Sequence, residues 1–484
     1  MKKLLLIFLP LIMLITSCSK DDPKEIDKVT EEAVKLIYYT IGEPDQDLKL
    51  VNEELNKLLK KKINVTVEYK KIPWDDYGSR INSLVNTNGD FDILFAASDS
   101  QGDFYSNAAD GKWLNIEPYL SNIGKEMYTA IDPILWEGMK VGDGIYGVPT
   151  NKDLAVPENF VFTEELVKKY KIDIAKYDTF SSLEPILAMI KEKEPEVIPL
   201  SMDSSRKNIF AFEGYEYVVS PYIPLMINSH DKELEVVNIY DTSYGREILN
   251  TLHSYYTKGY INSDASIRTM DSLFRDEKPL ITLASGGPFS HISWTIDRSY
   301  PVVANQVSPA IITTESVRSS VMVINSRTEH PEEAIKFLNL LNTDPEIRNL
   351  LNYGVPGVHY ELTDKNQIKI ISNAYRGVTY TQGNWFILNT TQGEPLDKWE
   401  RFKEFNDTAV PSELFGFTPD LEKYNNILNK IKTISAEYYP ALNTGSVDPS
   451  VYVQKYLEEL EEVGIAELKE ELQRQIDQWK SEDK

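Results

Sequence analysis

Cysteine is nearly absent from this chain, since Cys18 is the only thiol among 484 residues. One cysteine cannot form an intramolecular disulfide, so the fold has to be stabilised by its apolar cores. Histidine is also scarce, and the five histidines are scattered without the spacing of a metal site. We therefore expect no disulfide framework, no metal centre and no cofactor.

Signatures of catalysis are missing as well. The sequence contains neither H-E-x-x-H nor G-x-S-x-G, and the glycine-rich "SGGP" at 285–288 lacks both the lysine and the spacing of a phosphate-binding loop. The paired carboxylates of a glycosidase stay an open alternative, because 75 acidic residues produce close pairs by chance. The other absences indicate a binding protein and not an enzyme.

Positive charge is in deficit: 51 Lys and Arg residues stand against 75 Asp and Glu residues, for a formal net charge of −24. Binding to nucleic acid needs clustered cations against phosphates, so the composition excludes nucleic acid as a partner. Apolar residues make up 42% of the chain and charged residues 26%, which is normal for a folded protein. At this length we expect two or three domains.

The N-terminus carries the pattern of a secretion signal. Two lysines precede an apolar run at 4–15, and small residues follow it. This run is shorter than the ~20 residues that cross a bilayer as a helix. Residues 15–18, Ile-Thr-Ser-Cys, resemble the lipobox of bacterial lipoproteins, which implies that Cys18 carries a diacylglycerol on its sulfur and is the first residue of the mature chain. The alternative is an ordinary secretion signal with an incidental cysteine.

The next part of the sequence alternates between strand and helix patterns. Apolar strand patterns, including the continuous "ILFAA", are separated by segments with apolar residues at helical spacing. Such alternation predicts an α/β domain with a parallel sheet, and the continuous apolar run predicts burial on both faces. The expected strands are 34–42, 63–72 and 91–98, and the expected helices are 47–62 and 74–89.

Polar residues follow the third of these strands. Ligands of open α/β sheets bind beyond the carboxyl ends of the strands, so Ser98, Asp99 and Ser100 mark an expected pocket edge. A turn that caps the following helix is a compatible interpretation of the same residues.

Later segments continue the mixture of strands and helices. Residues 140–153 predict a hairpin, and 279–291 predict an apolar strand that ends in Gly-Gly-Pro. Residues 330–354 predict two helices, with Asp344 capping the second and Gly354 ending it. Further helices are expected at 163–170, 181–195 and 450–479.

Several of these stretches together resemble the extracellular solute-binding proteins of bacterial ABC importers, in particular the carbohydrate-type family 1 lipoproteins. "GDGIYGVPT" at 142–150 is similar to the hairpin where the family's chain first crosses between lobes. Residues 327–362 are similar to its helix pair and following turn, and 415–479 to the C-terminal domain of one lipoprotein subgroup. The resemblance implies an α/β, two-lobed, type II periplasmic-binding-protein fold with interdigitated lobes and a hinge.

The resemblance also implies a domain organisation and a function. We expect a signal peptide at 1–17, a flexible tether at 18–34, a first lobe of 35–150 plus 283–345, and a second lobe of 151–282 plus 346–484 with a helical C-terminal region. Such proteins close on a solute between their lobes and deliver it to ABC permease subunits. We therefore expect a monomer that binds a sugar or oligosaccharide and is lipid-anchored on the extracellular face of the membrane. A surface glycan-active hydrolase and a structural or adhesive lipoprotein stay open as alternatives.

Sugars present apolar ring faces and a rim of hydroxyls, which proteins contact with flat aromatic rings and a few polar groups. Trp385 stands out, because an indole beside Asn384 and Gln382 is a poor core pattern, whereas core packing explains most other aromatics. Gly286, at the end of a strand, would let a ligand approach the backbone. The expected ligand-binding residues are Trp74, Ser98, Asp99, Tyr146, Asn151, Asp203, Arg206, Ser285, Gly286, Gln382, Asn384 and Trp385.

Overall fold

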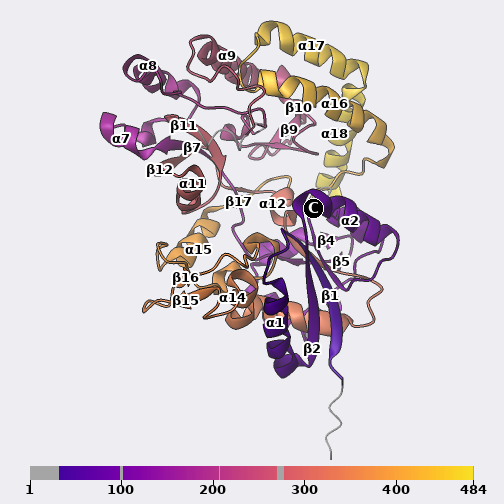
Figure 1. The fold of residues 1–484 in the computed structure, drawn as a ribbon. Coiled ribbons are helices and arrows are strands. Elements are labelled where there is room, and N and C mark those ends of the chain that lie inside the picture. Colours follow the sequence, from indigo (N-terminus) through magenta and orange to yellow (C-terminus); the bar gives the residue numbers. More distant parts are fainter. Residues whose placement is uncertain (1–31, 99–101, 206–207, 270–276, 483–484) are drawn as a thin grey trace, which may run out of the picture.

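The structure, a computed structural model, describes residues 32–98, 102–205, 208–269 and 277–482. Figure 1 shows two lobes, one around the indigo strands β1 and β2 and the other around β7 and the yellow helix α17. Each lobe has its own apolar core. The first core is made by side chains within 36–154 and 312–351 and by Tyr375, and the second by side chains within 160–283 and 414–476 and by Val307. The expected two-lobed α/β fold is confirmed.

The first lobe is built on a five-stranded sheet in the order β2-β1-β3-β14-β6. The three N-terminal strands run parallel, and β14 is antiparallel to both β3 and β6. The alternation predicted from the sequence is thereby confirmed, as is the hairpin before β6. The strands are β1 (Val34–Ile41), β2 (Val65–Ile72), β3 (Ile93–Ala96), β4 (Lys140–Val141), β5 (Gly144–Ile145), β6 (Val148–Pro149) and β14 (Val321–Ile324).

Helix α1 (Leu48–Ile63) protects the open edge of this sheet. β2 is an edge strand, so the N–H and C=O groups of alternate residues point away from the sheet. Asn52 accepts from the N–H of Tyr69 at 2.9 Å and donates to its C=O at 3.0 Å. Asn56 makes the same pair of bonds with Val67 at 2.7 and 3.1 Å. The two amides, one helical turn apart, therefore take the place of a neighbouring strand along β2.

The helix pair expected at 330–354 is confirmed as α13 (Pro331–Thr343) and α14 (Pro345–Tyr353). Asp344 caps α14 by accepting hydrogen bonds from two backbone N–H groups of the first turn, at 2.9 and 3.3 Å. Both helices contribute to the first core, although the sequence alone grouped residues after 345 with the second lobe. The other helices here are α2 (Trp74–Asn86), α3 (Phe104–Ala109), α4 (Glu117–Leu120), α5 (Lys125–Ala130), α6 (Pro133–Gly138) and α12 (Thr314–Arg318).

The second lobe contains two antiparallel sheets, in which β7 lies between β11 and β12, and β9 between β8 and β10. Pairing with β7 places β11 and β12 in this lobe, whereas the sequence alone grouped 283–345 with the first. The elements are β7 (Glu158–Thr163), β8 (Tyr215–Tyr217), β9 (Leu225–Asn228), β10 (Val237–Asn238), β11 (Ile281–Ser285), β12 (Val302–Gln306), α7 (Glu164–Tyr170), α8 (Glu184–Lys193), α9 (Ser243–Thr257) and α11 (Ser290–Arg298).

The C-terminal helices extend the core of the second lobe. Tyr240 stacks on Tyr439 with ring centroids 5.3 Å apart and meets Tyr456 edge-on at 5.1 Å. The Tyr240 hydroxyl also donates to the side-chain oxygen of Asn443 at 2.6 Å. This aromatic contact attaches α16 (Asn425–Leu442) and α17 (Pro449–Glu462) to the lobe, and apolar side chains of α18 (Ile465–Glu482) join the same core. Figure 1 shows these yellow helices beside the second lobe.

The chain between α14 and the C-terminal helices is largely irregular. It contains the hairpin of β15 (Tyr360–Leu362) and β16 (Ile368–Ile370), the short 3-10 turns at 379–381 and 385–387, and helix α15 (Lys398–Thr408). Among the helices that the structure describes, none combines the length and the apolar character that crossing a bilayer requires.

The chain passes between the two cores after Leu154, after Val307 and before Leu414. The second and third of these crossings run side by side, because β13 (Ile311–Ile312) pairs in parallel with β17 (Val410–Pro411). The first crossing lies between β6 and β7 and takes no part in the pairing of β13 with β17. The lobes are therefore joined by a narrow set of backbone segments.

The third crossing is attached to the second lobe by Ser412. The Ser412 hydroxyl donates to the carboxylate of Glu216 on β8, and its N–H donates to the C=O of Ile312 at 2.9 Å. Burial raises the pKa of the Glu216 carboxyl, and the hydrogen bond from Ser412 lowers it. Burial has the larger effect, and the resulting pKa is about 7. A titratable group thus lies at the point where the crossing meets the lobe.

We predict that the double variant Asn52→Ala/Asn56→Ala is less stable than the wild type. It removes the four hydrogen bonds that cover the edge of β2. At a net ~1 kcal/mol for each bond, the free energy of unfolding should fall by about 2–4 kcal/mol, and aggregation should increase because the edge is uncovered. Urea unfolding and light scattering measure both effects. Lys49→Ala, on an exposed face of α1, is the control, and equal stability of the two variants would contradict the role of the amides.

We predict that Glu216 makes stability fall as the pH rises. Its folded-state pKa lies above the value of an unfolded chain, so its stabilising effect is complete below about pH 4.5 and is lost as the pH rises through about 7. Glu216→Gln keeps an oxygen for Ser412 and should raise the free energy of unfolding at pH 8 by up to about 3 kcal/mol, with little change at pH 4.5. Urea unfolding at both pH values checks this, with the exposed Glu213→Gln as the control. A variant that loses stability at pH 8 would show that the prediction is wrong.

Candidate ligand-binding site

An aromatic pair, of which Trp74 is exposed and Tyr380 is partly buried, lies at the carboxyl ends of the strands in the first lobe. Trp74 directly follows β2 and is 41% exposed. Its ring lies 6.2 Å from that of Tyr380, at an angle of 32°, and Tyr380 rests edge-on against the buried Phe95. The hydroxyl of Ser98, just after β3, is buried and has no hydrogen-bond partner among the described residues. At the edge predicted from the strand pattern, Trp74 therefore offers a flat apolar surface, whereas the hydroxyl of Ser98 is not accessible in this conformation.

The segment around 379–387 carries the second aromatic candidate, Trp385, which is half-buried. Its indole N–H donates to the C=O of Thr379 at 3.0 Å. Gln382 is completely buried, between the hydroxyls of Tyr38 and Tyr69. Its amide therefore ties this segment to the core of the lobe and offers no exposed group to a ligand in this conformation.

Asn384 and Asn151 are both buried and hydrogen-bonded within the protein. The Asn384 amide donates to the C=O of Asn342 at 3.2 Å and accepts from the N–H of Phe386 at 2.9 Å. Asn151 is 4% exposed, and its backbone bonds to Gly383 and Trp385 at 3.1 and 2.9 Å. The two residues thus join the first crossing to the segment that carries Trp385. Contact with a ligand through these amides would require a rearrangement.

The remaining first-lobe candidate, Tyr146, is partly buried against the first core. In the second lobe, Asp203 is 1% exposed, and its carboxylate accepts from the N–H of Ser205 at 2.9 Å, as in a turn. Cys18, Asp99 and Arg206 lie outside the described residues.

The end of β11 forms the polar edge of the second lobe. Ser285 is exposed, and the C=O of Gly286 accepts from the side chain of Asn159 at 2.9 Å. A Cβ on Gly286 would lie 2.5 Å from the Ser290 hydroxyl oxygen and 2.7 Å from the ring of Trp294. The glycine therefore allows close packing against α11, which is a structural reason for its presence and differs from the ligand contact expected from the sequence.

The two edges approach each other at an aromatic cluster. Phe289, in the loop after β11, packs against Phe402 of α15 with centroids 6.2 Å apart, and Trp385 meets the same ring edge-on. A Cβ on Gly287 would lie 3.6 Å from Phe402 and 3.7 Å from a carboxylate oxygen of Asp153 in the first crossing. The Trp385 segment, α15, the first crossing and the end of β11 thus converge.

Two residues at these edges were missed by the sequence analysis. Tyr380 is the partner of Trp74 and had no local signal apart from its place near Trp385. Glu158 is 4% exposed at the first position of β7, and its Oε1 accepts from the Ser285 hydroxyl at 2.5 Å and the Asn208 amide at 3.3 Å. An acid at the start of the otherwise apolar "ENFVFT" is the signal that could have identified Glu158.

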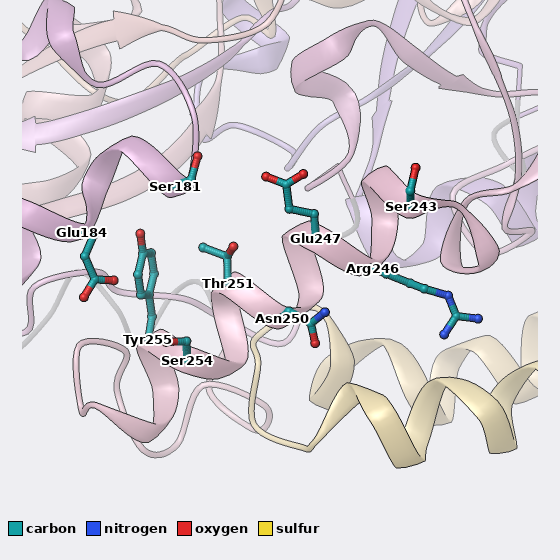
Figure 2. Close-up of a pocket in the computed structure, with 9 residues that line it drawn as sticks. All are labelled: Ser181, Glu184, Ser243, Arg246, Glu247, Asn250, Thr251, Ser254 and Tyr255. Carbon is teal, nitrogen blue, oxygen red and sulfur yellow. The ribbon is translucent and has the colours of Figure 1, made fainter.

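A separate surface hollow of about 570 Å³ lies between α8 and α9, on the second lobe (Figure 2). Ser181 and Glu184 line one side and residues of α9 the other. Its one aromatic side chain, Tyr255, is 1% exposed and donates its hydroxyl to the C=O of Phe180 at 2.7 Å. The hollow therefore lacks an aromatic face for stacking, and we do not assign the ligand to it. Its lining is Ser181, Glu184, Ser243, Arg246, Glu247, Asn250, Thr251, Ser254 and Tyr255.

Comparison with known proteins agrees with this architecture. A family model described as a domain of unknown function, DUF3502, matches residues 413–481. A carbohydrate ABC transporter substrate-binding protein of Streptococcus pneumoniae serotype 4 is 28% identical over 471 residues, which are 94% of this chain and 92% of that protein. The match extends along nearly the whole of both chains.

The N-glycan transport solute-binding protein NgtS of Streptococcus pneumoniae has a similar crystal structure. Its TM-score is 0.84 at 26% identity, covering 93% of this chain and 100% of that chain. NgtS in complex with Man5GlcNAc gives a TM-score of 0.71 and in complex with Man1GlcNAc 0.73, over 93% and 92% of this chain and 99% of that chain in each case. Sequence and fold together identify this chain as a relative of the carbohydrate-type substrate-binding proteins of ABC transporters, the family that its motifs resemble.

Proposed function

We propose that this protein is a lipid-anchored, extracellular substrate-binding protein of an ABC importer and that it binds an oligosaccharide between its lobes. The observation that carries the proposal is the exposed Trp74, whose ring contacts that of Tyr380 at the carboxyl edge of the first sheet. A large flat ring held in this way suits the apolar face of a sugar. The polar edge around Ser285 would supply hydrogen bonds from the other lobe.

The relatives support an oligosaccharide ligand. NgtS binds Man5GlcNAc and Man1GlcNAc in its crystal structures. Neutral mannose-rich oligosaccharides are therefore the first ligands to test with this chain. The TM-score of this chain is 0.84 with the NgtS structure that names no glycan, and 0.71 and 0.73 with the two NgtS complexes. This difference supports lobes that change their arrangement when a ligand binds.

The free energies of such contacts are sufficient for micromolar affinity. Covering half of a Trp face removes ~75 Å² of apolar area from water, which contributes about 2 kcal/mol. Each net hydrogen bond adds about 1 kcal/mol, and micromolar affinity needs about −8 kcal/mol. One or two aromatic platforms with several hydrogen bonds meet this requirement. Binding therefore needs no chemical step, and we propose that the ligand leaves unchanged.

We also propose that the protein delivers its ligand to permease subunits, which its similarity to an ABC transporter substrate-binding protein supports. The anchor rests on the lipobox-like residues 15–18, and the tether on the polar sequence after Cys18. A diacylated cysteine binds membranes far more firmly than a single acyl chain would. We propose that the protein acts there as a monomer, since its two lobes supply both sides of the ligand site.

We predict that residues 19–484 bind a neutral oligosaccharide and leave it intact. In a panel that includes Man5GlcNAc, the ligand should raise the melting temperature, and Trp74→Ala should weaken its affinity by about 10- to 30-fold, because the stacking surface is lost. Calorimetry measures the affinity and mass spectrometry the integrity of the sugar. Tyr452→Ala, an exposed aromatic residue on α17, is the matched control. Release of a shorter glycan over hours would instead favour a hydrolase.

We predict that Cys18→Ser moves the protein from the membrane to the soluble fraction. The serine hydroxyl cannot form the thioether that holds the diacylglycerol in lipoproteins, so the tether loses its anchor. Fractionation of bacterial cells expressing the full chain, followed by immunoblotting, measures the distribution. An unchanged membrane-bound share of the variant would contradict lipidation at this position.

A further inference from the structure

Glu158 is a nearly buried acid that has no positively charged partner among the described residues. Only 4% of the residue is exposed, and buried acids in proteins are normally paired with a cation. Its Oε1 accepts hydrogen bonds from two neutral groups, the Ser285 hydroxyl and the Asn208 amide. Among the residues that the structure describes, no cation contacts the carboxylate and no donor bonds to Oε2. The acceptor capacity of this carboxylate is therefore only partly used.

The backbone of Glu158 is fixed where the lobe meets its connections. Its N–H donates to the Ser308 hydroxyl at 2.8 Å, and its C=O accepts from the N–H of Val307, also at 2.8 Å. These bonds join the end of the first crossing to the beginning of the second. Across the sheet, Glu158 pairs with Ser285, the last and exposed residue of β11. The carboxylate is thus held rigidly at the edge of the second lobe where the crossings enter.

A fixed carboxylate selects ligands by their hydrogen-bonding chemistry. Its oxygens accept hydrogen bonds and donate none, so they require a hydroxyl or an amide N–H. A hydrogen bond from such a donor to a charged acceptor is about twice as strong as one between neutral groups. A carboxylate or sulfate on a sugar would instead be repelled across a poorly solvated edge. The protein's net charge of −24 also disfavours acidic sugars, at longer range.

We propose that Glu158 determines sugar specificity from the second lobe: its carboxylate accepts hydrogen bonds from the hydroxyls of a neutral sugar and disfavours acidic sugars. The inference rests on the proposed function and adds to it the class of sugar. It also accounts for the absence of a cation next to Glu158 in the described part of the chain, because a paired lysine or arginine would occupy the acceptor positions that the ligand needs.

A purely structural role makes a different prediction. If Glu158 served only to hold Ser285 and Asn208, then Glu158→Gln would retain an oxygen for both, and ligand affinity would not change. If the negative charge itself held the fold together, the same variant would lower the melting temperature. Removal of an unpaired, nearly buried charge should leave stability equal or higher when that charge serves the ligand.

The experiment compares wild type, Glu158→Gln and the control Glu165→Gln, an exposed acid on α7 that gives the same change in net charge. Affinities are measured by calorimetry for Man5GlcNAc, for the other neutral oligosaccharides of the panel, and for an oligomannuronate of matched length. We expect Glu158→Gln to bind the best neutral ligand about tenfold more weakly. Its preference for neutral over acidic sugar should narrow, and its melting temperature should equal or exceed that of the wild type.

Three results would overturn the inference alone: unchanged neutral affinity in Glu158→Gln, an unchanged ratio of neutral to acidic affinity, or a wild type that prefers the oligomannuronate. A parallel fall of affinity and melting temperature would assign Glu158 a structural role and would also overturn it. A wild type that binds no sugar of either kind would overturn the proposed function together with the inference. Glu165→Gln should behave as the wild type throughout.

Discussion

The division of the apolar side chains into two separate cores constrains everything else in this protein. Among the residues that the structure describes, none belongs to both cores, so each lobe is stabilised by its own packing and the lobes are joined by three short crossings. Well-packed interiors resist deformation, whereas a few connecting residues absorb changes of backbone angle at low cost. A rearrangement of the lobes can therefore occur without repacking either core. The pairing of β13 with β17 keeps two crossings together during such a movement.

Buried amides organise the face that the first lobe presents at this junction. Gln382, Asn384 and Asn151 are each at most 4% exposed and bond to tyrosine hydroxyls or backbone groups. An amide that is buried without partners costs free energy, so these partners define one conformation of the 382–385 segment. The result is a rigid support from which Trp385 reaches the aromatic cluster. Polar side chains act here as part of the framework, and the aromatic rings supply the accessible surface.

The C-terminal helices belong to the second lobe and do not form a separate domain. The match to the domain of unknown function covers 413–481, which begins beside the third crossing and includes α16, α17 and α18. Stacked tyrosines from these helices enter the same core as Tyr240. Because Ser412 bonds to Glu216 and to Ile312, the start of this region is also the place where the crossing is attached. The region therefore contributes both to the core of the second lobe and to the place where the third crossing is attached.

The sequence by itself determined the local elements of this protein. The apolar periods of 34–98 predicted three strands and two helices, and Asp344 predicted a helix start, because propensity, capping and periodicity act between neighbours along the chain. It also pointed to the carboxyl edge of the sheet, where Trp74 lies exposed. Only the tertiary structure decided which strands share a sheet. For this reason the sequence alone assigned residues from 283 on, and with them the end of β11 and all of β12, to the first lobe. It likewise decided that Gln382 is buried, that Gly286 packs on α11 and that Glu158 has only neutral partners among the residues described. Burial and pairing of polar groups depend on residues hundreds of positions away, and no local pattern carries that information.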